Sequence, residues 1–174
     1  MKIIILIILF LFNSNIVNSN NNIVYLDIQF IIDKSDLGLF YKKKIKKLQD
    51  EINKDVKKRE KIIKDKETDI KNKKNILSND ELNKSLNDLE KTVKEYRIYR
   101  SEKNELIINE KKKYTSSILV ILNPIITDFV EKNNISLVLD KKNILIGAKV
   151  LDITKNVIML FNEEAKKQKL LNEN

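Results

Sequence analysis

The stretch that decides the fold lies between Tyr41 and Tyr114 and reads YKKKIKKLQDEINKDVKKREKIIKDKETDIKNKKNILSNDELNKSLNDLEKTVKEYRIYRSEKNELIINEKKKY. It contains neither glycine nor proline, carries most of the lysines of the chain, and keeps aliphatic residues at a spacing of three or four positions. That spacing places them on one narrow stripe of a helix. Such a stripe can hold one helix against one partner, but it cannot fill a globular core. The stretch therefore predicts a long helical hairpin.

The stripe runs through both halves of this stretch and slightly beyond it. In the first half it consists of Ile45, Leu48, Ile52, Val56, one of the pair Ile62/Ile63, Ile70 and one of the pair Ile76/Leu77. In the second half it consists of Leu82, Leu86, Leu89, Val93, Tyr96, Ile107, Tyr114, Ile118, Ile121 and Leu122. Charged residues interrupt it at Arg59, Lys66, Arg100, Lys103 and Glu110.

The turn of the hairpin is marked by Ser78-Asn79-Asp80-Glu81. A serine followed three positions later by a glutamate forms a capping box, in which each side chain binds the backbone N–H of the other residue. We expect Ser78 and Glu81 to start the second helix at a tip near residues 78–81. The two helices, about 36–77 and 79–123, would each be roughly 60 Å long at ~1.5 Å per residue. Pro124 is expected to kink or end the second helix.

The rest of the chain is small. The expected fold class is α+β, with an arm over residues 42–123 and a β-rich association base over residues 20–41 and 124–174. A base of that size is near the lower limit for a stable core, so burial against copies of the same chain would stabilise it. The sequence has no cysteine, so disulfides cannot contribute. We therefore expect an oligomer.

The net charge is concentrated in the arm. Residues 42–113 hold 24 Lys and Arg against 15 Asp and Glu, an excess of +9, and the whole chain is also +9. One interpretation is a solvated helix surface in a chain rich in Lys, Ile and Asn. The other is attraction to acidic polypeptides, phosphates or an anionic membrane surface.

Residues 1–19 have the composition of a secretory signal peptide. Met1-Lys2 supplies a positive charge, residues 3–12 form an unbroken apolar run, and residues 13–19 are mostly polar and end in Val17-Asn18-Ser19. About ten apolar residues are too few to cover ~30 Å of hydrocarbon, which disfavours a membrane anchor. We expect cleavage near Ser19 and a mature protein outside the cytoplasm.

The base contains several strand-like segments. Residues 23–31 predict a strand that leads through a short link into the arm, and residues 135–140 and 144–147 predict a hairpin around the polar turn at 140–143. Asp152-Ile153-Thr154 precedes the apolar positions of a last helix. Asp152 and Thr154 are therefore its expected caps.

The order of these parts resembles the Skp/OmpH family of periplasmic chaperones. The matching residues are Ile23-Val24-Tyr25-Leu26-Asp27 with Ser35 and Gly38, the run Leu137-Val138-Leu139-Asp140, and Asp152-Ile153-Thr154 with Val157 and Leu160. The resemblance implies a homotrimer with a shared base and three pairs of arms in the periplasm. It also implies a central cavity that holds an unfolded outer-membrane protein, the client, without ATP. The resemblance also implies lipopolysaccharide or anionic lipid as a partner, but no residue here can be aligned with such a site.

A holdase needs apolar side chains that face the client. Transmembrane β-strands alternate apolar and polar residues, and before insertion their apolar half has no lipid to cover it. The expected client-facing residues are apolar ones off the main stripe: Ile63, Leu77, Ile98, Tyr99, Leu106 and Ile108. The alternative is that they only widen the contact between the two helices.

The composition argues against catalysis and against nucleic-acid binding. The chain has no histidine, no cysteine, two glycines and no glycine-rich phosphate loop. Asp27, Asp140 and Asp152 lie at strand ends and helix starts, where lone carboxylates usually hold backbone N–H groups. Tyr96 and Tyr99 beside Arg97 and Arg100 fit helix packing better than base stacking. No enzyme activity, metal or cofactor is expected.

Two other functions stay open at this point. A structural coiled-coil protein of the envelope would need a continuous heptad seam, and the interruptions at Arg59, Lys66, Arg100 and Lys103 loosen that pairing. A membrane-surface binding module would use the basic arm.

Overall fold

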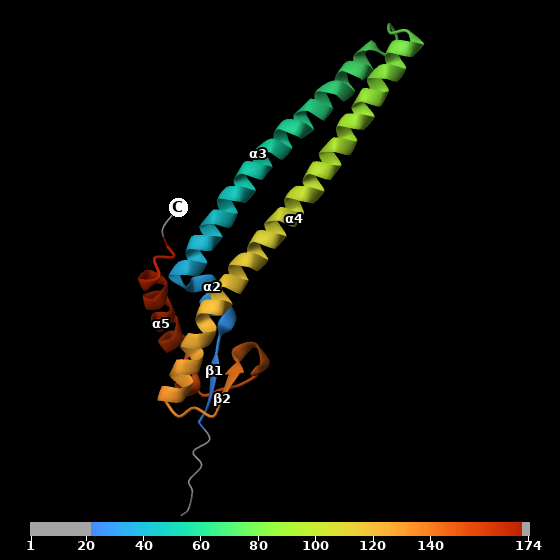
Figure 1. Ribbon diagram of the computed structural model, residues 1–174. Helices are drawn as coiled ribbons and strands as arrows, with labels where there is room; N and C mark the ends of the chain where they lie inside the picture. The colour runs from blue at the N-terminus through green and yellow to red at the C-terminus, as the bar shows by residue number, and fades with distance from the viewer. Residues whose placement is uncertain (1–21, 172–174) are drawn as a thin grey trace, which may run out of the picture.

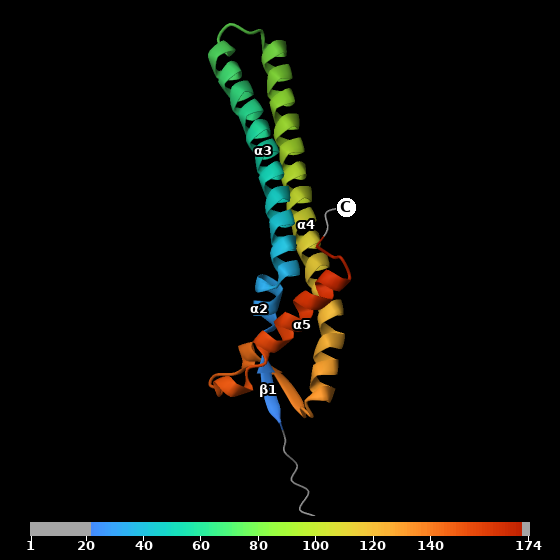
Figure 2. The same ribbon diagram turned by 90° about the vertical axis from the view of Figure 1, so that its left-hand side faces the viewer.

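A long two-helix arm projects from a small base. The computed structural model describes residues 22–171, so the expected signal peptide at 1–19 lies outside the described residues. Helices α3 (Asp36–Lys73) and α4 (Asn79–Lys132) lie antiparallel, side by side, and extend well beyond the base (Figures 1 and 2). Their 38 and 54 residues correspond to about 57 and 81 Å at ~1.5 Å per residue.

Side-chain caps start both arm helices. The buried hydroxyl of Ser35 accepts a hydrogen bond of 3.1 Å from the Gly38 N–H at the start of α3. At the far end, the Ser78 hydroxyl accepts from the Glu81 N–H, and the Glu81 carboxylate accepts from the Ser78 N–H at 2.9 Å. This is the reciprocal pattern of a capping box. Ser78 therefore lies at the distal turn, far from the base.

Helix α4 does not end at Pro124. It continues to Lys132, so the expected end of the second helix near residue 123 is wrong. Proline removes one backbone hydrogen bond from a helix. Around it, Leu122 is buried and Ile125, Ile126 and Phe129 pack against the core of the base. Apolar burial along this face offsets the lost bond.

The base is less β-rich than the sequence predicts. Strand β1 (Ile23–Leu26) ends early because the Asp27 carboxylate accepts from the Phe30 N–H at 2.8 Å and starts helix α2 (Ile28–Lys34). The expected strand over residues 23–31 is therefore half helix. Most of the base is formed by α2, the end of α4 and helix α5 (Thr154–Lys167).

The expected hairpin over residues 135–147 is also wrong. Strand β2 (Leu137–Asp140) pairs in parallel with β1, in the register Ile23↔Leu137 to Leu26↔Asp140. Two short 3-10 turns, η1 (Lys141–Asn143) and η2 (Lys149–Leu151), follow. The Asp140 carboxylate accepts from the Lys142 N–H and turns the chain out of the sheet. Gly147 then passes the ring of Tyr25 so closely that a Cβ there would lie 2.8 Å from it.

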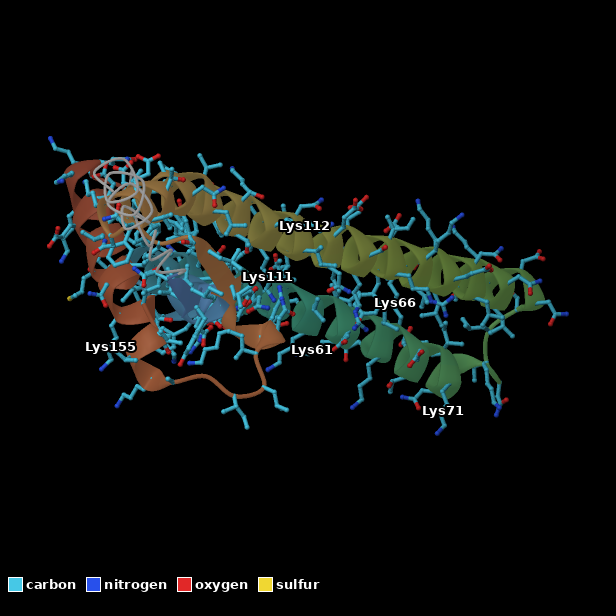
Figure 3. The ribbon with its side chains drawn as sticks, turned by 90° about the horizontal axis from the view of Figure 1, so that it is seen from below. Lys61, Lys66, Lys71, Lys111, Lys112 and Lys155 are labelled. Atoms are coloured by element: carbon cyan, nitrogen blue, oxygen red, sulfur yellow. The ribbon has the colours of Figure 1, made fainter. Side chains whose placement is uncertain are left out.

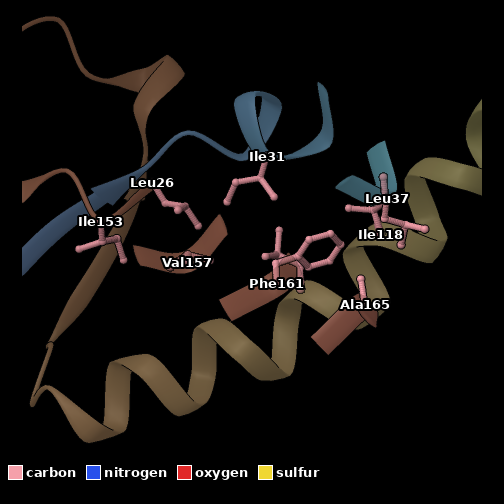
Figure 4. Close-up of a cluster of buried hydrophobic side chains, with 9 residues drawn as sticks. Leu26, Ile31, Leu37, Ile118, Ile153, Val157, Phe161 and Ala165 are labelled. Atoms are coloured by element: carbon pink, nitrogen blue, oxygen red, sulfur yellow. The ribbon is translucent and has the colours of Figure 1, made fainter. Parts of the chain in front are cut away.

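The core lies where α5 crosses the other helices of the base (Figure 4). Val157, Phe161 and Ala165 on one face of α5 are fully buried. They form one cluster with Leu26, Ile31, Leu37, Ile118, Leu122 and Ile153. Spacings of four residues on α5 place its three apolar side chains on one face. The root of the arm is thereby fixed to the sheet.

Candidate functional site

The contact between the arm helices is apolar near the base and polar at mid-arm. Near the base, Ile45 and Ile52 are buried. Further out, the Lys66 ammonium reaches across to α4, where it lies 2.5 Å from the Asp88 carboxylate and 2.8 Å from the Thr92 hydroxyl. The hydrogen bond from Lys66 lowers the pKa of Asp88. Lys66 therefore acts as a polar contact where a heptad seam would place an apolar residue.

Two tyrosines extend this polar section. The Tyr96 hydroxyl donates to the Glu60 carboxylate, and this bond raises the pKa of Tyr96. The Arg59 guanidinium lies 4.1 Å from the ring centroid of Tyr99. That geometry is a cation–π contact. Both rings are used to join α4 to α3.

A groove lies at the root of the arm, between α3 and α4. It encloses about 870 Å³, and the rings of Tyr41 and Tyr114 stack in it with centroids 4.1 Å apart. Burial raises the pKa of Tyr114. The groove is lined by Gln29, Ile32, Asp33, Gly38, Tyr41, Lys42, Ile45, Lys46, Gln49, Asp50, Asn53, Asn104, Ile107, Lys111, Tyr114, Thr115 and Ile118. We call it the root groove.

A second hollow lies on α4 closer to the tip. It encloses about 430 Å³ and is lined by Leu86, Leu89, Glu90, Val93, Lys94 and Arg97. Leu89 and Val93 are half-buried, whereas Leu86 is exposed. We call it the distal hollow. Both concave sites combine an apolar floor with charged edges. This combination suits an apolar group that is flanked by polar groups in the same ligand.

Lysine side chains lie along both arm helices, among them Lys61 and Lys71 on α3 and Lys111 and Lys112 on α4 (Figure 3). Among the described residues, only three arm lysines form ion pairs, namely Lys58, Lys66 and Lys73. Their partners Asp55 and Asp69 lie on the same helix as Lys58 and Lys73. Most of the positive charge of the arm is thus left to act on other molecules or on counterions.

The base carries an exposed apolar loop. Leu145 is 97% exposed, Ile146 89% and Val150 86%, although all three follow directly from the sheet region. In the described part of the chain β2 pairs with β1 alone, which leaves its other edge unpaired. Exposed apolar side chains and an unpaired strand edge are each typical of an interface.

The three carboxylates of the base hold backbone groups. Asp27 accepts from Phe30, Asp140 from Lys142, and Asp152 from Thr154 at 3.0 Å. The Lys141 ammonium lies 3.5 Å from Asp27 and 3.4 Å from Asp152, and its pKa is raised, chiefly by the hydrogen bond to Asp152. The cluster ties the end of β1 to the start of α5.

Within residues 22–171 no group of three His, Cys, Asp or Glu side chains is placed to hold a metal ion. Over the same residues, no helix combines the length and the apolar character that a membrane span requires.

Comparison with known proteins shows the family of this chain. The family described as Outer membrane protein (OmpH-like) matches residues 22–160. The chain belongs to this OmpH-like family. The match covers β1, α2, both arm helices, β2 and the first half of α5. The family resemblance predicted from the sequence is confirmed.

The solved structures contain the same fold. An OmpH-like protein from Caulobacter crescentus CB15 superposes with a TM-score of 0.74 at 15% identity, covering 82% of this chain and 84% of that chain. At that identity the likeness concerns the fold. A search of curated proteins found no match.

The six predicted client-facing residues of this OmpH-like chain differ in their exposure to solvent. Ile98, Leu106 and Ile108 are 49%, 37% and 53% exposed on α4. Tyr99 instead lies against Arg59 of α3, in the interhelical contact. Ile63 is half-buried, like the residues seven positions before and after it, Val56 and Ile70. Leu77 is half-buried at the distal turn.

The expected caps of the last helix take different roles. Helix α5 begins at Thr154, and Ile153 occupies the cap position without a side-chain bond. Asp152, one residue before this cap position, accepts a hydrogen bond from the Thr154 N–H, the first of the helix. The Thr154 hydroxyl instead accepts from the Asp27 N–H at 2.9 Å, which corrects its expected role as a cap.

The two hollows are not evident from the sequence. The sequence places Leu86, Leu89, Val93 and Tyr114 on the interhelical stripe, and Tyr41 at the start of the stretch. A signal was present in the seven-residue recurrence of Glu90, Arg97, Asn104 and Lys111. Positions seven apart repeat the same helix face.

Proposed function

We propose that this chain is a periplasmic holdase that keeps unfolded outer-membrane proteins soluble without ATP. The observation that carries the proposal is the arm, which presents exposed apolar side chains among unpaired lysines far from any core that could bury them. Membership of the OmpH-like family supports it, as does the fold shared with a Caulobacter protein described as a candidate outer-membrane chaperone.

The physical basis is many weak contacts. Each exposed aliphatic side chain on the arm covers little apolar surface, so a single contact with a client is weak. Several contacts on one polypeptide raise the total affinity while each one still exchanges quickly. Lysines attract acidic segments of the client at longer range. No bond in this scheme requires a nucleotide, and the sequence has no glycine-rich phosphate loop.

The arm is poorly suited to the alternative role of a rigid structural coiled coil. Arg59 and Lys66 occupy the interhelical region, where Lys66 binds Asp88 and Arg59 lies over Tyr99. Such polar contacts lower the stability of a coiled coil. A spacer would gain from replacing them with leucine, whereas a binding arm has no such requirement.

The proposal includes a homotrimer with a shared base. The exposed Leu145, Ile146 and Val150, and also the unpaired edge of β2, would be buried between subunits. Covering an apolar patch and an open strand edge together stabilises a small base.

An aggregation assay tests the proposed function. A urea-unfolded outer-membrane β-barrel protein is diluted into buffer with or without residues 20–174 of this chain, and light scattering is followed. We expect the chain to suppress the rise in scattering, and to do so less well as salt screens the lysines. Scattering that rises as fast as in buffer would refute the holdase.

A further inference from the structure

The root groove and the distal hollow lie on the same flank of α4. Glu90 and Arg97 line the distal hollow, and Asn104 and Lys111 line the root groove. These four residues follow one another at intervals of seven. Seven residues make nearly two turns of an α-helix, so all four share one flank. The same seven-residue interval separates Leu86 from Val93 in the distal hollow. It also separates Ile107 from Tyr114 in the root groove.

One exposed apolar residue lies on this flank at the level of the root groove. Ile108 is fourteen residues after Lys94 of the distal hollow and seven before Thr115 of the root groove. It is 53% exposed. The flank therefore presents apolar surface at the two levels of the arm that the hollows occupy. We call it the grooved flank.

The spacing of the hollows matches one extended strand. The midpoints of their α4 linings are roughly twenty residues apart, which is about 30 Å along the helix. An extended chain covers 30 Å in about nine residues at ~3.3 Å each. A transmembrane β-strand has ≈ 9–11 residues.

The charges of both hollows favour the same kind of segment. Lys94 and Arg97 face one glutamate, Glu90, at the distal hollow. The root groove has three lysines against two aspartates. Each site is thus slightly cationic around an apolar floor. It complements an apolar side chain whose neighbour is acidic.

We propose that the grooved flank binds a single extended client strand along the arm, with two large apolar side chains of the strand seated in the two hollows. This inference rests on the proposed function and specifies where and in what form the client binds. Successive side chains of a strand point to opposite faces, so the two anchors are separated by an even number of residues. Eight or ten residues fit the spacing, whereas four do not.

Tryptophan peptides provide the test, because the chain contains no tryptophan. Three soluble 12-residue peptides of equal composition, each with two tryptophans and two aspartates, carry the tryptophans four, eight or ten positions apart. Their fluorescence is titrated with residues 20–174. We expect the wider spacings to bind at least about threefold more tightly, because the second anchor then binds intramolecularly.

Two substitutions and a matched control locate the site. Leu86→Gln alters the distal hollow, and Asn104→Glu places a negative charge in the root groove. Ile62→Gln changes an aliphatic residue of α3 that is 50% exposed, close to the 45% of Leu86, and lines neither hollow. We expect each of the first two variants to abolish the advantage of wide spacing and Ile62→Gln to retain it. Helicity by circular dichroism verifies that all three are folded.

The outcomes separate this inference from the proposed function. If the chain suppresses aggregation but binds the three peptides equally, or if Leu86→Gln and Ile62→Gln behave alike, the grooved flank is not the client track and the holdase stands. If the chain does not suppress aggregation, the holdase fails in its own assay, and a client track on this arm fails with it.

Discussion

The Lys66 ammonium lies 2.5 Å from the Asp88 carboxylate and joins the two arm helices at mid-arm. The pair is open to solvent, because the Lys66 and Asp88 side chains retain 34% and 60% of their accessible surface. Exposed ion pairs contribute little to stability and are weakened by salt. The pair therefore connects the two helices at a defined position but adds little to their stability.

Replacing this lysine should have a small effect that depends on salt. Lys66→Ala is expected to lower the urea midpoint of unfolding slightly at low ionic strength and to match the wild type when salt screens the pair. Lys71→Ala, on the same helix and without an ion pair among the described residues, serves as the control. A large loss that persists in high salt would show that Lys66 packs rather than pairs.

The contribution of the Lys66–Asp88 pair to stability should depend on pH, and the direction of the pKa shift of Asp88 gives the sign. The hydrogen bond and charge of Lys66 hold the pKa of Asp88 below its ordinary 3.8. A carboxyl group with a lowered folded pKa contributes stability that is fully present above the unfolded pKa. That contribution is lost as the pH falls through the folded pKa. The difference in urea midpoint between wild type and Asp88→Asn should therefore be largest near neutral pH and shrink in acid. A difference that grows as the pH falls would contradict the assignment.

The base should depend strongly on the ring of Phe161. Its side chain is fully buried where α5 meets α2 and α4. Phe161→Ala should cost about 3–5 kcal/mol, through lost burial and the cavity left behind. Met159→Ala, at a position 58% exposed on the same helix, should change the free energy of unfolding by no more than about 0.5 kcal/mol. Urea denaturation measures both, and similar losses would mean that the core is placed incorrectly.

Assembly should depend on the exposed loop of the base. Ile146→Glu puts a charge into the patch that the proposed trimer buries, and we expect it to dissociate the oligomer into helical monomers. Sedimentation velocity measures the mass, and circular dichroism measures the helicity. Ile76→Glu, at an 80% exposed position near the tip, should leave the assembly intact. A wild-type chain that sediments as a monomer would refute the trimer itself.

The arm could be predicted from the sequence because its signals are local. Ser78 and Glu81 are three positions apart, and the apolar stripe recurs every three or four residues, so both can be recognised without knowing any distant partner. The pairing of Ile23 with Leu137 could not be predicted in this way. It joins segments at opposite ends of the chain, and neither segment specifies a parallel partner.

The candidate site was predicted less well. The spacing of apolar residues shows that a segment is helical, but it does not show which side of the helix faces the partner. Ile63 and Tyr99 were expected outside the stripe, yet Ile63 is half-buried and Tyr99 contacts α3. With apolar residues on adjacent positions 62 and 63, the sequence does not decide which one faces the partner helix. Likewise, the run at 144–147 is apolar enough for a strand, but Leu145 and Ile146 are exposed in the single chain.

The most direct test of the account is site-specific photo-crosslinking to a bound client. A photoreactive side chain is placed at Ile108 on the arm or at Met159 on the base, which are 53% and 58% exposed. Each variant is mixed with a urea-diluted outer-membrane β-barrel protein and irradiated. The account predicts abundant crosslinks to the client from position 108 and few from position 159. Equal crosslinking from both positions, or crosslinks from position 159 alone, would contradict it.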